Sequence, residues 1–424
     1  MTVIQQDVTQ STQVSEKYKY MVMYVLAFSV VLTGFLFDPF DQILEGLMRI
    51  FTSPSILVSD YFAIGNIGAA FINAGVLMIL STSIAYKASV GMNGPVIAAV
   101  LTVGGFALFG KNLLNVWPII IGVWLHARYQ KEPFSKFILP ALFGTALAPL
   151  VSQVSFGFDL VQPYGLLLGG IFGLVAGFAL PPLATHFVRF HQGFNLYNIG
   201  FTSGIIGMIF MSFFRAYGLQ NPPTMIVLEG ENERLAMFLV VFFLLILAIG
   251  IKSERNPKHH FNKIMKQSGR LVSDFVSTEG FGASMINMAV VGFLSTAYVW
   301  AVWGDLNGAT IGGIFTIVGF GAFGKHPKNI LPIFLGIYLA ASLKIWEVNA
   351  TGAVLAALFG TTLAPIAGTY GWPYGILAGF FHMAVVMNVG FLHGGLNLYN
   401  NGFAGGFVAA VLVPIINSIK RNTE

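Results

Sequence analysis

The sequence predicts an all-α integral membrane protein with two inverted-topology repeats, and the first observation behind this prediction is the composition. The 424 residues are 56% hydrophobic and only 9% charged, with a mean hydropathy of +0.76. A soluble protein carries about 25% charged residues. So few charges cannot cover a water-facing surface, and most of the outside must therefore face lipid. The 49 glycines fit membrane helices that pack closely through small residues.

The second observation is a series of apolar segments of nearly bilayer length. Tyr20–Leu36, Leu235–Ile251 and Tyr374–Leu392 approach the roughly 20 apolar residues that span a bilayer. Each half of the chain contains about seven segments, and the short pair 94–110 and 308–324 are candidates for re-entrant half-helices. The segments of the first half lie at about 19–37, 62–86, 94–110, 113–128, 136–153, 164–186 and 195–215, and those of the second half at about 235–251, 280–303, 308–324, 328–345, 352–367, 374–392 and 397–418.

The third observation is an internal duplication. Residues 191–204 and 393–406 share the frame His-x-Gly-apolar-Asn-Leu-Tyr-Asn-x-Gly-Phe-x-x-Gly, at an offset of 202 residues. Repeated units of roughly two hundred residues are too long for a solenoid and are typical of transporter halves. Further matches in the same order are Leu57–Tyr61 with Leu271–Phe275, Asn73 with Asn287, Gly105–Lys111 with Gly319–Lys325, and Leu142–Pro149 with Leu358–Pro365.

The distribution of lysine and arginine indicates that the two repeats have opposite orientations. Basic residues accumulate at the cytoplasmic ends of membrane segments. They precede the first segment of the first half at Lys17 and Lys19, but they follow the first segment of the second half between Lys252 and Arg270. An odd number of crossings in each half explains this reversal. Both chain termini are then expected in the cytoplasm.

These patterns divide the chain into five parts. Met1–Glu16 is polar and lacks the pattern of a cleaved signal, so we expect the first membrane segment to be retained. The expected location is the bacterial cytoplasmic membrane, as a multi-pass protein. The parts are a cytoplasmic tail at 1–17, the first membrane repeat at 18–217, an extracytoplasmic linker at 218–233, the second, inverted membrane repeat at 234–418, and a cytoplasmic tail at 419–424.

Polar residues that are repeated in register are the candidates for a transport path. Inverted repeats bring equivalent broken helices together near the midplane, and polar groups at that depth are costly. The alternative interpretation is that these residues cap helices and join them through hydrogen bonds, with the histidines bonded at the membrane boundary. The candidate residues are Asn195, Tyr197, Asn198, Asn397, Tyr399, Asn400, His191, His393, Asn73 and Asn287.

Two pairs of charged residues are also repeated in register. Lys111 and Lys325 follow a glycine-flanked turn, where they would gate the path or steer an anion. The alternative for them is a short loop with a snorkelling lysine. Asp60 and Asp274 precede glycine-rich helix starts and would bind a coupling ion such as H⁺ or Na⁺. For these aspartates the pattern favours the alternative, an N-cap at the membrane surface.

The residue inventory gives no indication of enzyme chemistry. Cysteine is absent, no His, Asp and Glu cluster has metal-ligand spacing, and no catalytic triad or phosphate-binding loop is recognisable. We therefore expect a protein that is not an enzyme, with no catalytic residue, metal or cofactor. The basic residues are scattered, which does not indicate nucleic-acid binding. The expected partners are the lipid bilayer and a small polar solute, and a homo-oligomer is left open.

The expected function is a transporter or channel for a small polar solute, with its path at the interface of the two repeats. The duplicated motif offers neutral amide and phenol groups, which suit an uncharged or weakly charged solute. One alternative is a small-anion channel or transporter that uses Lys111 and Lys325. Another is a membrane scaffold or sensor that transports nothing.

The duplicated chain resembles, over its whole length, a bacterial family of membrane proteins known only as a domain of unknown function, and this resemblance implies no activity. A weaker resemblance is to the urea transporters, which also have two inverted halves. It covers Gly65–Gly75 and Gly280–Asn287 at one helix entry, and Gly193–Gly204 and Gly395–Gly406 at a glycine-rich turn. The glutamine typical of the urea-transporter entry is replaced by Ala69 and Ala283. The resemblance therefore favours transport but transfers no urea site.

Overall fold

The computed structural model describes residues 14–343 and 345–421, and this part of the chain is helical. Its only β pairing within those residues is an isolated bridge between Ser59 and Ile226. Ten of the described helices are long and apolar enough to cross a membrane. The protein is therefore a polytopic helical membrane protein, which confirms the prediction from composition.

The two halves contain the same elements in the same order. Each predicted group of seven apolar segments consists of five helices of spanning length and one hairpin of two shorter helices. The first repeat comprises α1 (Glu16–Phe37), α2 (Phe40–Phe51), α3 (Tyr61–Ile64), α4 (Ile67–Lys87), α5 (Gly94–Phe106), α6 (Val116–Tyr129), α7 (Ile138–Gly144), α8 (Ala148–Ser152), α9 (Tyr164–Phe187) and α10 (Asn198–Ala216). The second comprises α11 (Asn232–Lys252), α12 (Pro257–Ile264), α13 (Phe275–Thr278), α14 (Phe281–Ala301), α15 (Gly308–Phe320), α16 (Pro327–Ser342), α17 (Thr351–Gly360), α18 (Ala364–Tyr370), α19 (Trp372–His393) and α20 (Asn400–Arg421).

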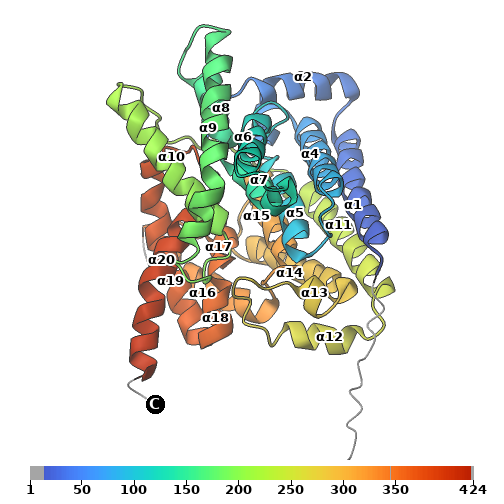
Figure 1. Cartoon of the computed structure of the whole chain (residues 1–424). Coiled ribbons are helices and arrows are strands. Elements are labelled where there is room, and N and C mark those ends of the chain that lie inside the picture. Colours follow the sequence, from blue (N-terminus) through green and yellow to red (C-terminus); the bar gives the residue numbers. More distant parts are fainter. Residues whose placement is uncertain (1–13, 344, 422–424) are drawn as a thin grey trace, which may run out of the picture.

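The two repeats are inverted with respect to each other. In Figure 1, α1 runs upward and leads into α2, which lies across the upper face of the molecule. Its counterpart α11 runs downward and leads into α12, which lies across the lower face. The start of α1 and the end of α20 both lie on the face that carries α12. We call this the termini face, and the opposite face, which carries α2 and the linker 217–231, the linker face.

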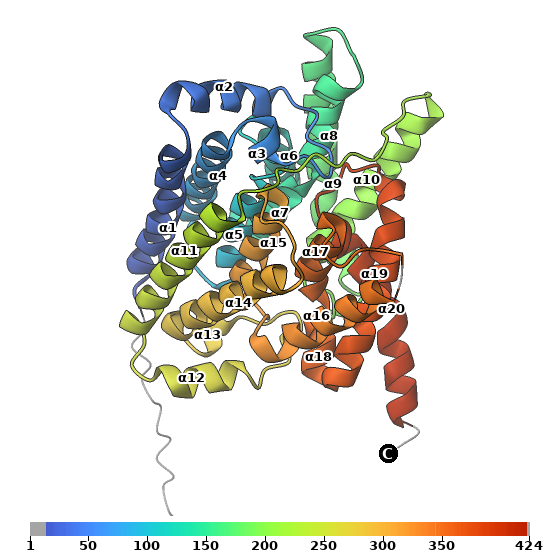
Figure 2. The same cartoon turned by 180° about the vertical axis from the view of Figure 1, so that it is seen from behind.

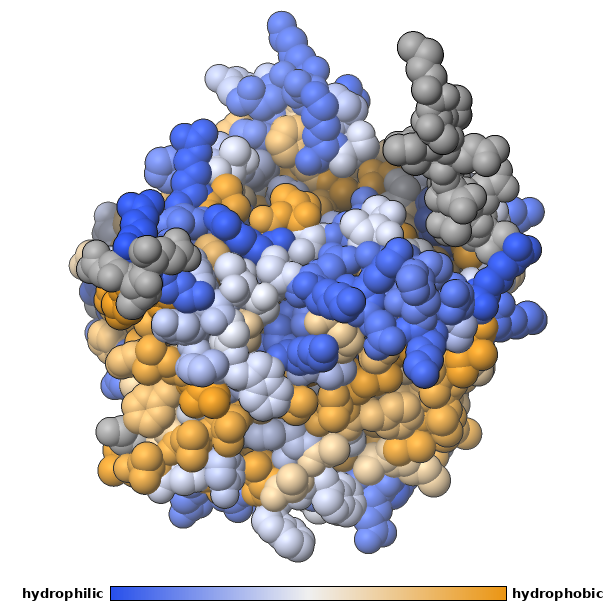
Figure 3. Space-filling view, turned by 90° about the horizontal axis from the view of Figure 1, so that it is seen from below, coloured by the Kyte–Doolittle hydropathy of each residue, from blue (hydrophilic) through white to orange (hydrophobic). Residues whose placement is uncertain are grey.

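The short amphipathic helices α2 and α12 lie on opposite faces of the molecule. Such helices place an apolar side against the bundle and a polar side toward the headgroups. Figure 3 views the termini face, where hydrophilic residues gather over a broad area and hydrophobic residues continue from its edge. This distribution suits a protein whose sides contact lipid and whose faces contact water.

The centre of the molecule is an antiparallel pair formed by α5 and α15. Both helices have 13 residues, all of them buried, so each is too short for the ~30 Å hydrocarbon core. The pair approaches closely because glycine backbones meet. A Cβ atom on Gly105 would lie 2.6 Å from the carbonyl oxygen of Gly312. Glycine at this crossing therefore lets equivalent segments of the two repeats meet on the pseudo-two-fold axis.

Each central helix ends in a turn inside the bundle and returns as the next helix. Gly110 and Gly324 adopt positive φ angles of 155° and 111° at these turns. The Asn73 side chain donates hydrogen bonds to the carbonyl oxygens of Ala107 and Lys111, at 2.7 and 2.8 Å. Asn73 lies about 9 Å along α4 from its first residue, so the turn sits below the membrane surface. The hairpins α5–α6 and α15–α16 are the re-entrant segments.

Candidate functional site

Eight aromatic side chains from the repeated motifs meet on the pseudo-two-fold axis. The rings of Tyr197 and Tyr399 lie 5.0 Å apart between centroids. Each tyrosine packs against a central phenylalanine of the other repeat, with ring centroids 4.5 Å apart for Tyr399 and Phe106 and 4.9 Å apart for Tyr197 and Phe320. We call this group the aromatic septum. Its members are Phe106, Phe109, Phe143 and Tyr197 with their repeat equivalents Phe320, Phe323, Phe359 and Tyr399.

Two cavities approach the septum, and they are lined by equivalent residues of the two repeats. The linker-side cavity has a volume of about 520 Å³ and the termini-side cavity one of about 390 Å³. Because the repeats are inverted, equivalent linings face opposite sides of the membrane. The equivalent pairs are Val58 with Val272, Phe109 with Phe323, Phe359 with Phe143, Leu398 with Leu196, and Asn400 with Asn198, the linker-side member first.

The two cavities differ in depth and in covering. The termini-side cavity reaches both central tyrosines, Tyr197 and Tyr399. The lining of the linker-side cavity includes Phe109 and Phe359 but neither tyrosine. The linker contributes Asn221 and residues 223–225 to the linker-side lining. It is held there by the Val58 amide, which donates to the Thr224 carbonyl oxygen at 2.9 Å. The septum is thus approached closely from the termini face and is roofed on the linker face.

The first asparagine of each duplicated motif joins the two repeats. The Asn195 side chain donates to the Gly402 carbonyl oxygen at 2.8 Å, and Asn397 donates to the Gly200 carbonyl oxygen at 3.2 Å. These bonds cross the pseudo-two-fold axis between the starts of α20 and α10. Both asparagines are buried, and neither belongs to the lining of the two cavities. Their observed contacts fit the interhelical alternative.

The second asparagine of each motif faces a cavity and is fixed by a histidine. Asn198 Oδ1 lies 3.0 Å from His191 Nε2, and its amide donates to the Ala184 carbonyl oxygen at 3.0 Å. Asn400 Oδ1 lies 2.9 Å from His393 Nε2 in the same arrangement. Asn198 and Asn400 line the termini-side and linker-side cavities respectively, and His393 also lines the latter. The histidine therefore orients a cavity amide in both halves.

The two repeated lysines are buried beside the septum, and their surroundings differ. Lys325 Nζ donates to the Tyr197 hydroxyl at 2.5 Å and to Thr361 Oγ1 at 2.7 Å. Lys111 Nζ has no hydrogen-bond partner among residues 14–343 and 345–421, and it lies 4.9 Å from the centroid of the Phe106 ring. Both lysines are 0% exposed. The snorkelling alternative is therefore wrong for both residues.

Asn73 and Asn287 support the turns that carry these lysines. Asn287 donates to the carbonyl oxygens of Gly321 and Lys325, each at 2.7 Å, as Asn73 does in the first repeat. Neither asparagine belongs to the lining of the two cavities. The observed contacts place them behind the path, as positioning residues for the lysine turns.

The two repeated aspartates hold helix starts in both repeats. Asp274 Oδ1 accepts hydrogen bonds from the Ser277 amide at 3.1 Å and from the Gly94 amide, at the start of α5, at 3.0 Å. Asp60 accepts from the Phe62 amide at 2.8 Å and from the linker residue Leu228 at 2.9 Å. These contacts agree with the N-cap interpretation. Ion coupling by Asp60 and Asp274 stays a prediction.

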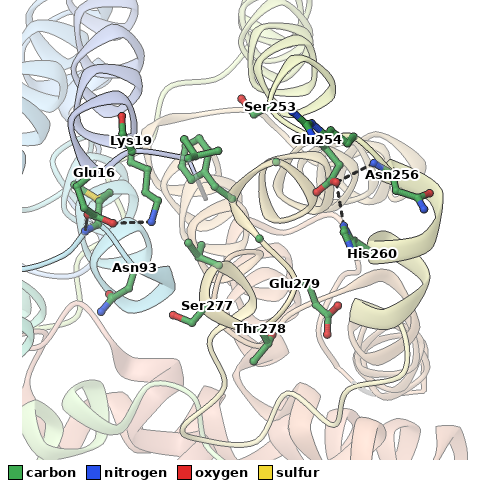
Figure 4. A pocket seen from close by; sticks show the side chains of 18 of the residues that line it. Glu16, Lys19, Asn93, Ser253, Glu254, Asn256, His260, Ser277, Thr278 and Glu279 are labelled. Atoms are coloured by element: carbon green, nitrogen blue, oxygen red, sulfur yellow. Dashed lines mark hydrogen bonds and ion pairs between the residues drawn. The ribbon is translucent and has the colours of Figure 1, made fainter. Parts of the chain in front are cut away.

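A third cavity of about 1040 Å³ lies on the termini face, away from the septum (Figure 4). Its lining comes from the starts of α1, α5 and α14 and from α12. Two pairs of its ionisable side chains are in contact. Lys19 Nζ lies 2.7 Å from Glu16, and His260 Nδ1 lies 3.0 Å from Glu254. Over the described residues no group of three His, Cys, Asp or Glu side chains is arranged to hold a metal ion.

The sequence interpretation missed three features of the site. It did not select the phenylalanines of the septum, although Phe106, Phe109 and Phe143 repeat in register with their equivalents. It also missed Thr361 as a lysine partner and the linker as a roof. The phenylalanines stand inside the very motifs that carry the glycines and lysines, which is the signal that would have identified them.

The fold and the site define a polytopic membrane protein in which inverted repeats enclose a central septum between two cavities. Residues 40–216 and 253–418 match the family described as "Protein of unknown function (DUF1576)", and the chain therefore belongs to this family. The two matched regions correspond to the two repeats. Comparison with curated proteins and with solved structures finds no match, so nothing there supports the resemblance to urea transporters.

Proposed function

We propose that this protein is a transporter or channel that moves a small polar solute between the two faces of the membrane. One observation carries the proposal: two cavities lined by repeat-equivalent residues approach one septum from opposite faces. Inverted repeats that meet at the midplane are the arrangement from which many secondary transporters build their paths. A scaffold has no need of such a pair of cavities.

The path runs from Asn198 on the termini side, past Tyr197 and Tyr399, to Asn400 on the linker side. The two amides and two phenols supply hydrogen-bonding groups for a solute that has left water. The septum is closed in this structure, because ring centroids 4.5–5.0 Å apart are in contact and leave no opening between them. Passage requires the rings to separate, so a conformational step accompanies each transport event.

The proposal places the termini face in the cytoplasm of a bacterial cell. The basic residues between Lys252 and Arg270, and those at Lys17 and Lys19, all belong to that side of the fold. Basic residues accumulate on the cytoplasmic side of membrane proteins. The chain has no cysteine, so single cysteines at positions 258 and 231 permit labelling with an impermeant maleimide. Position 231 is expected to react from outside the cell, and position 258 only after the membrane is opened.

The flux experiment uses purified protein in liposomes and small solutes such as urea, glycerol, nitrate and formate. The wild type is expected to accelerate the passage of at least one solute over protein-free liposomes. Phe106→Ala with Phe320→Ala removes two rings of the septum that carry no hydrogen-bonding group, and the flux is expected to rise several-fold because the barrier is thinned. The matched control is Tyr129→Ala, because Tyr129 is 73% exposed on the outside of the bundle.

The outcomes separate transport from the scaffold alternative. An increase in flux with the double variant, and an unchanged flux with the control, supports a path through the septum. An unchanged flux in a folded double variant moves the path elsewhere. A folded wild type that passes none of the solutes contradicts the proposal and favours a scaffold.

A further inference from the structure

Two buried lysines without acidic partners flank the septum. Burying an uncompensated cation is costly, and buried charges in proteins are normally paired. Within the described residues no ion pair involves Lys111 or Lys325. The turns that carry them do not require the ammonium groups, because Asn73 and Asn287 already hold the turn carbonyls. Support of the turns therefore does not explain why the two cations are buried.

The ammonium groups lie where a solute has to pass. Lys325 Nζ is 4.5 Å from the centroid of the Tyr197 ring, and Lys111 Nζ is 4.9 Å from that of Phe106, which itself contacts Tyr399. A solute that separates the septum rings therefore comes within a few ångströms of both ammonium groups. Such groups attract anions and repel cations along a pore.

The cavity linings carry no negative charge to counter the lysines. Neither the linker-side nor the termini-side lining includes an aspartate or a glutamate, and Lys136 of the termini-side lining is paired with Glu132 at 2.6 Å. The two repeated aspartates are engaged with backbone amides at helix starts. The charges that stand beside the path without an acidic partner are therefore those of the two buried lysines.

Lys111 presents donors that nothing in the described structure accepts. Its equivalent, Lys325, is bonded to the oxygens of Tyr197 and Thr361. The corresponding oxygens of the other half are not bonded to Lys111. Thr145 donates to the Leu142 carbonyl oxygen at 2.6 Å, as Thr361 does to that of Leu358, but it accepts nothing from Lys111. The Tyr399 hydroxyl stands beside the Thr102 hydroxyl, and within the described residues neither makes a bond of hydrogen-bond geometry. An ammonium group and a hydroxyl group are thus both vacant beside Phe106.

We infer that the solute is a small monovalent anion and that Lys111 and Tyr399 bind it at the septum. The equivalent site in the other half, where Lys325 is hydrogen-bonded to Tyr197 and Thr361, represents the same site without an anion. This inference rests on the proposed function. A single vacant ammonium group matches a single negative charge. The closed septum, whose ring centroids lie 4.5–5.0 Å apart, restricts the anion to a small one, such as nitrate, formate or a halide.

The test measures anion and neutral flux in the same proteoliposomes. Nitrate and formate fluxes are compared with urea and glycerol fluxes for the wild type, Lys111→Met, Lys325→Met and the matched control Lys258→Met, which changes an exposed lysine on α12. Methionine keeps the length and volume of the side chain and removes the charge. The wild type is expected to favour an anion, and Lys111→Met to lower that flux on the order of tenfold or more, the effect of losing a charged hydrogen bond. Lys258→Met is expected to leave it unchanged.

A binding measurement removes the dependence on flux. Nitrate is added at increasing concentration, and a sulfonate too large for the cavities serves as the control at equal ionic strength. Nitrate is expected to raise the Tm of the wild type and not that of Lys111→Met, because a ligand stabilises the state that binds it. Should Lys111→Met fail to fold, Tyr399→Phe, which keeps the ring and removes the free hydroxyl, takes its place. Two outcomes overturn the inference and leave the proposed function standing. In one, the protein passes urea or glycerol but no anion. In the other, Lys111→Met and Tyr399→Phe both keep the anion flux and the Tm shift of the wild type. A folded protein that passes neither class contradicts the proposed function itself.

Discussion

The two halves of the molecule hold equivalent lysines in different ways. In the second repeat Lys325 is bonded to Tyr197 and Thr361, and the cavity on that side of the septum reaches the central tyrosines. In the first repeat Lys111 is unbonded, and the cavity on its side is roofed by the linker. The backbone plan is common to both halves, so the difference lies in a few side chains. One sequence thus shows two states of the same local structure.

Within the matched motifs Leu142–Pro149 and Leu358–Pro365 one position differs, and it follows Thr361, which accepts a bond from Lys325. Thr362 accepts a hydrogen bond from the Tyr197 amide at 3.0 Å and donates to Asn195 Oδ1 at 2.5 Å. The equivalent residue of the first repeat is Ala146, which holds the other turn only through its carbonyl oxygen and the Leu398 amide, at 3.0 Å. The Tyr197 turn is consequently held by more bonds than the Tyr399 turn. If the halves exchange their arrangements during transport, Thr362 favours the arrangement seen here.

The largest effect is expected from removing each lysine charge in turn. Both Lys325→Met and Lys111→Met remove the cost of burying a cation. The resulting gain in unfolding free energy is similar in the two variants, so it cancels when they are compared. Only Lys325→Met also loses two charged hydrogen bonds and leaves the buried Tyr197 hydroxyl without its partner. We expect Lys325→Met to be less stable than Lys111→Met by roughly 2–4 kcal/mol, because each such bond contributes about 1.5–3 kcal/mol before compensation.

The measurement is equilibrium unfolding of both variants in detergent, with Lys258→Met as the control for handling and for charge. Equal unfolding free energies for Lys325→Met and Lys111→Met would show that the two ammonium groups have the same surroundings in solution. The comparison between the halves would then be lost.

A smaller and symmetric effect is expected behind the lysines. Asn73→Ala and Asn287→Ala each remove two hydrogen bonds and leave two buried carbonyl oxygens without their donor. We expect each to lower the unfolding free energy by roughly 2 kcal/mol, with the two values equal within about 0.5 kcal/mol. The control is Asn388→Ala, because Asn388 is exposed near the end of α19. Unequal losses would place part of the asymmetry in the turns, not in the ammonium groups.

The fold was largely predictable because its determinants are patterns of apolar residues and repeats. The duplicated motifs and the reversed basic residues predict inversion, and the coordinates show it in α1 and α11. The sequence marks the segments 94–110 and 308–324 as re-entrant candidates, but it does not show that each forms a hairpin with the helix that follows. In the sequence, a 13-residue apolar helix such as α5 cannot be distinguished from a short spanning helix. The structure distinguishes them, because Asn73 holds the turn that follows Gly110 inside the bundle.

The site was predictable only in part, because residue types do not reveal which neighbour a polar group faces. Asn195 and Asn198 stand in one motif, yet the first crosses to Gly402 and only the second lines a cavity. The septum depends on contacts between segments more than two hundred residues apart, such as Tyr197 with Tyr399. The difference between Lys111 and Lys325 is invisible in their motifs, which are nearly identical. It arises from the tertiary partners of each ammonium group.

The smallest effect, and the finest test of the comparison, concerns the position where the halves differ. Thr362→Ala gives the second repeat the residue of the first and removes both side-chain bonds to the Tyr197 turn. We expect it to lower the unfolding free energy by about 1 kcal/mol, since Leu196 keeps its bond to the carbonyl oxygen of residue 362. The reciprocal Ala146→Thr offers the Tyr399 turn the hydroxyl that it lacks.

A single cysteine at position 198, in this cysteine-free chain, then reports the termini-side cavity through its rate of maleimide labelling. Thr362→Ala together with Ala146→Thr exchanges the two local sequences. The arrangement with a hydrogen-bonded lysine is then expected to move to the first repeat, and the labelling rate at position 198 is expected to fall. An unchanged rate in a folded double variant would mean that Thr362 does not decide which lysine is bonded.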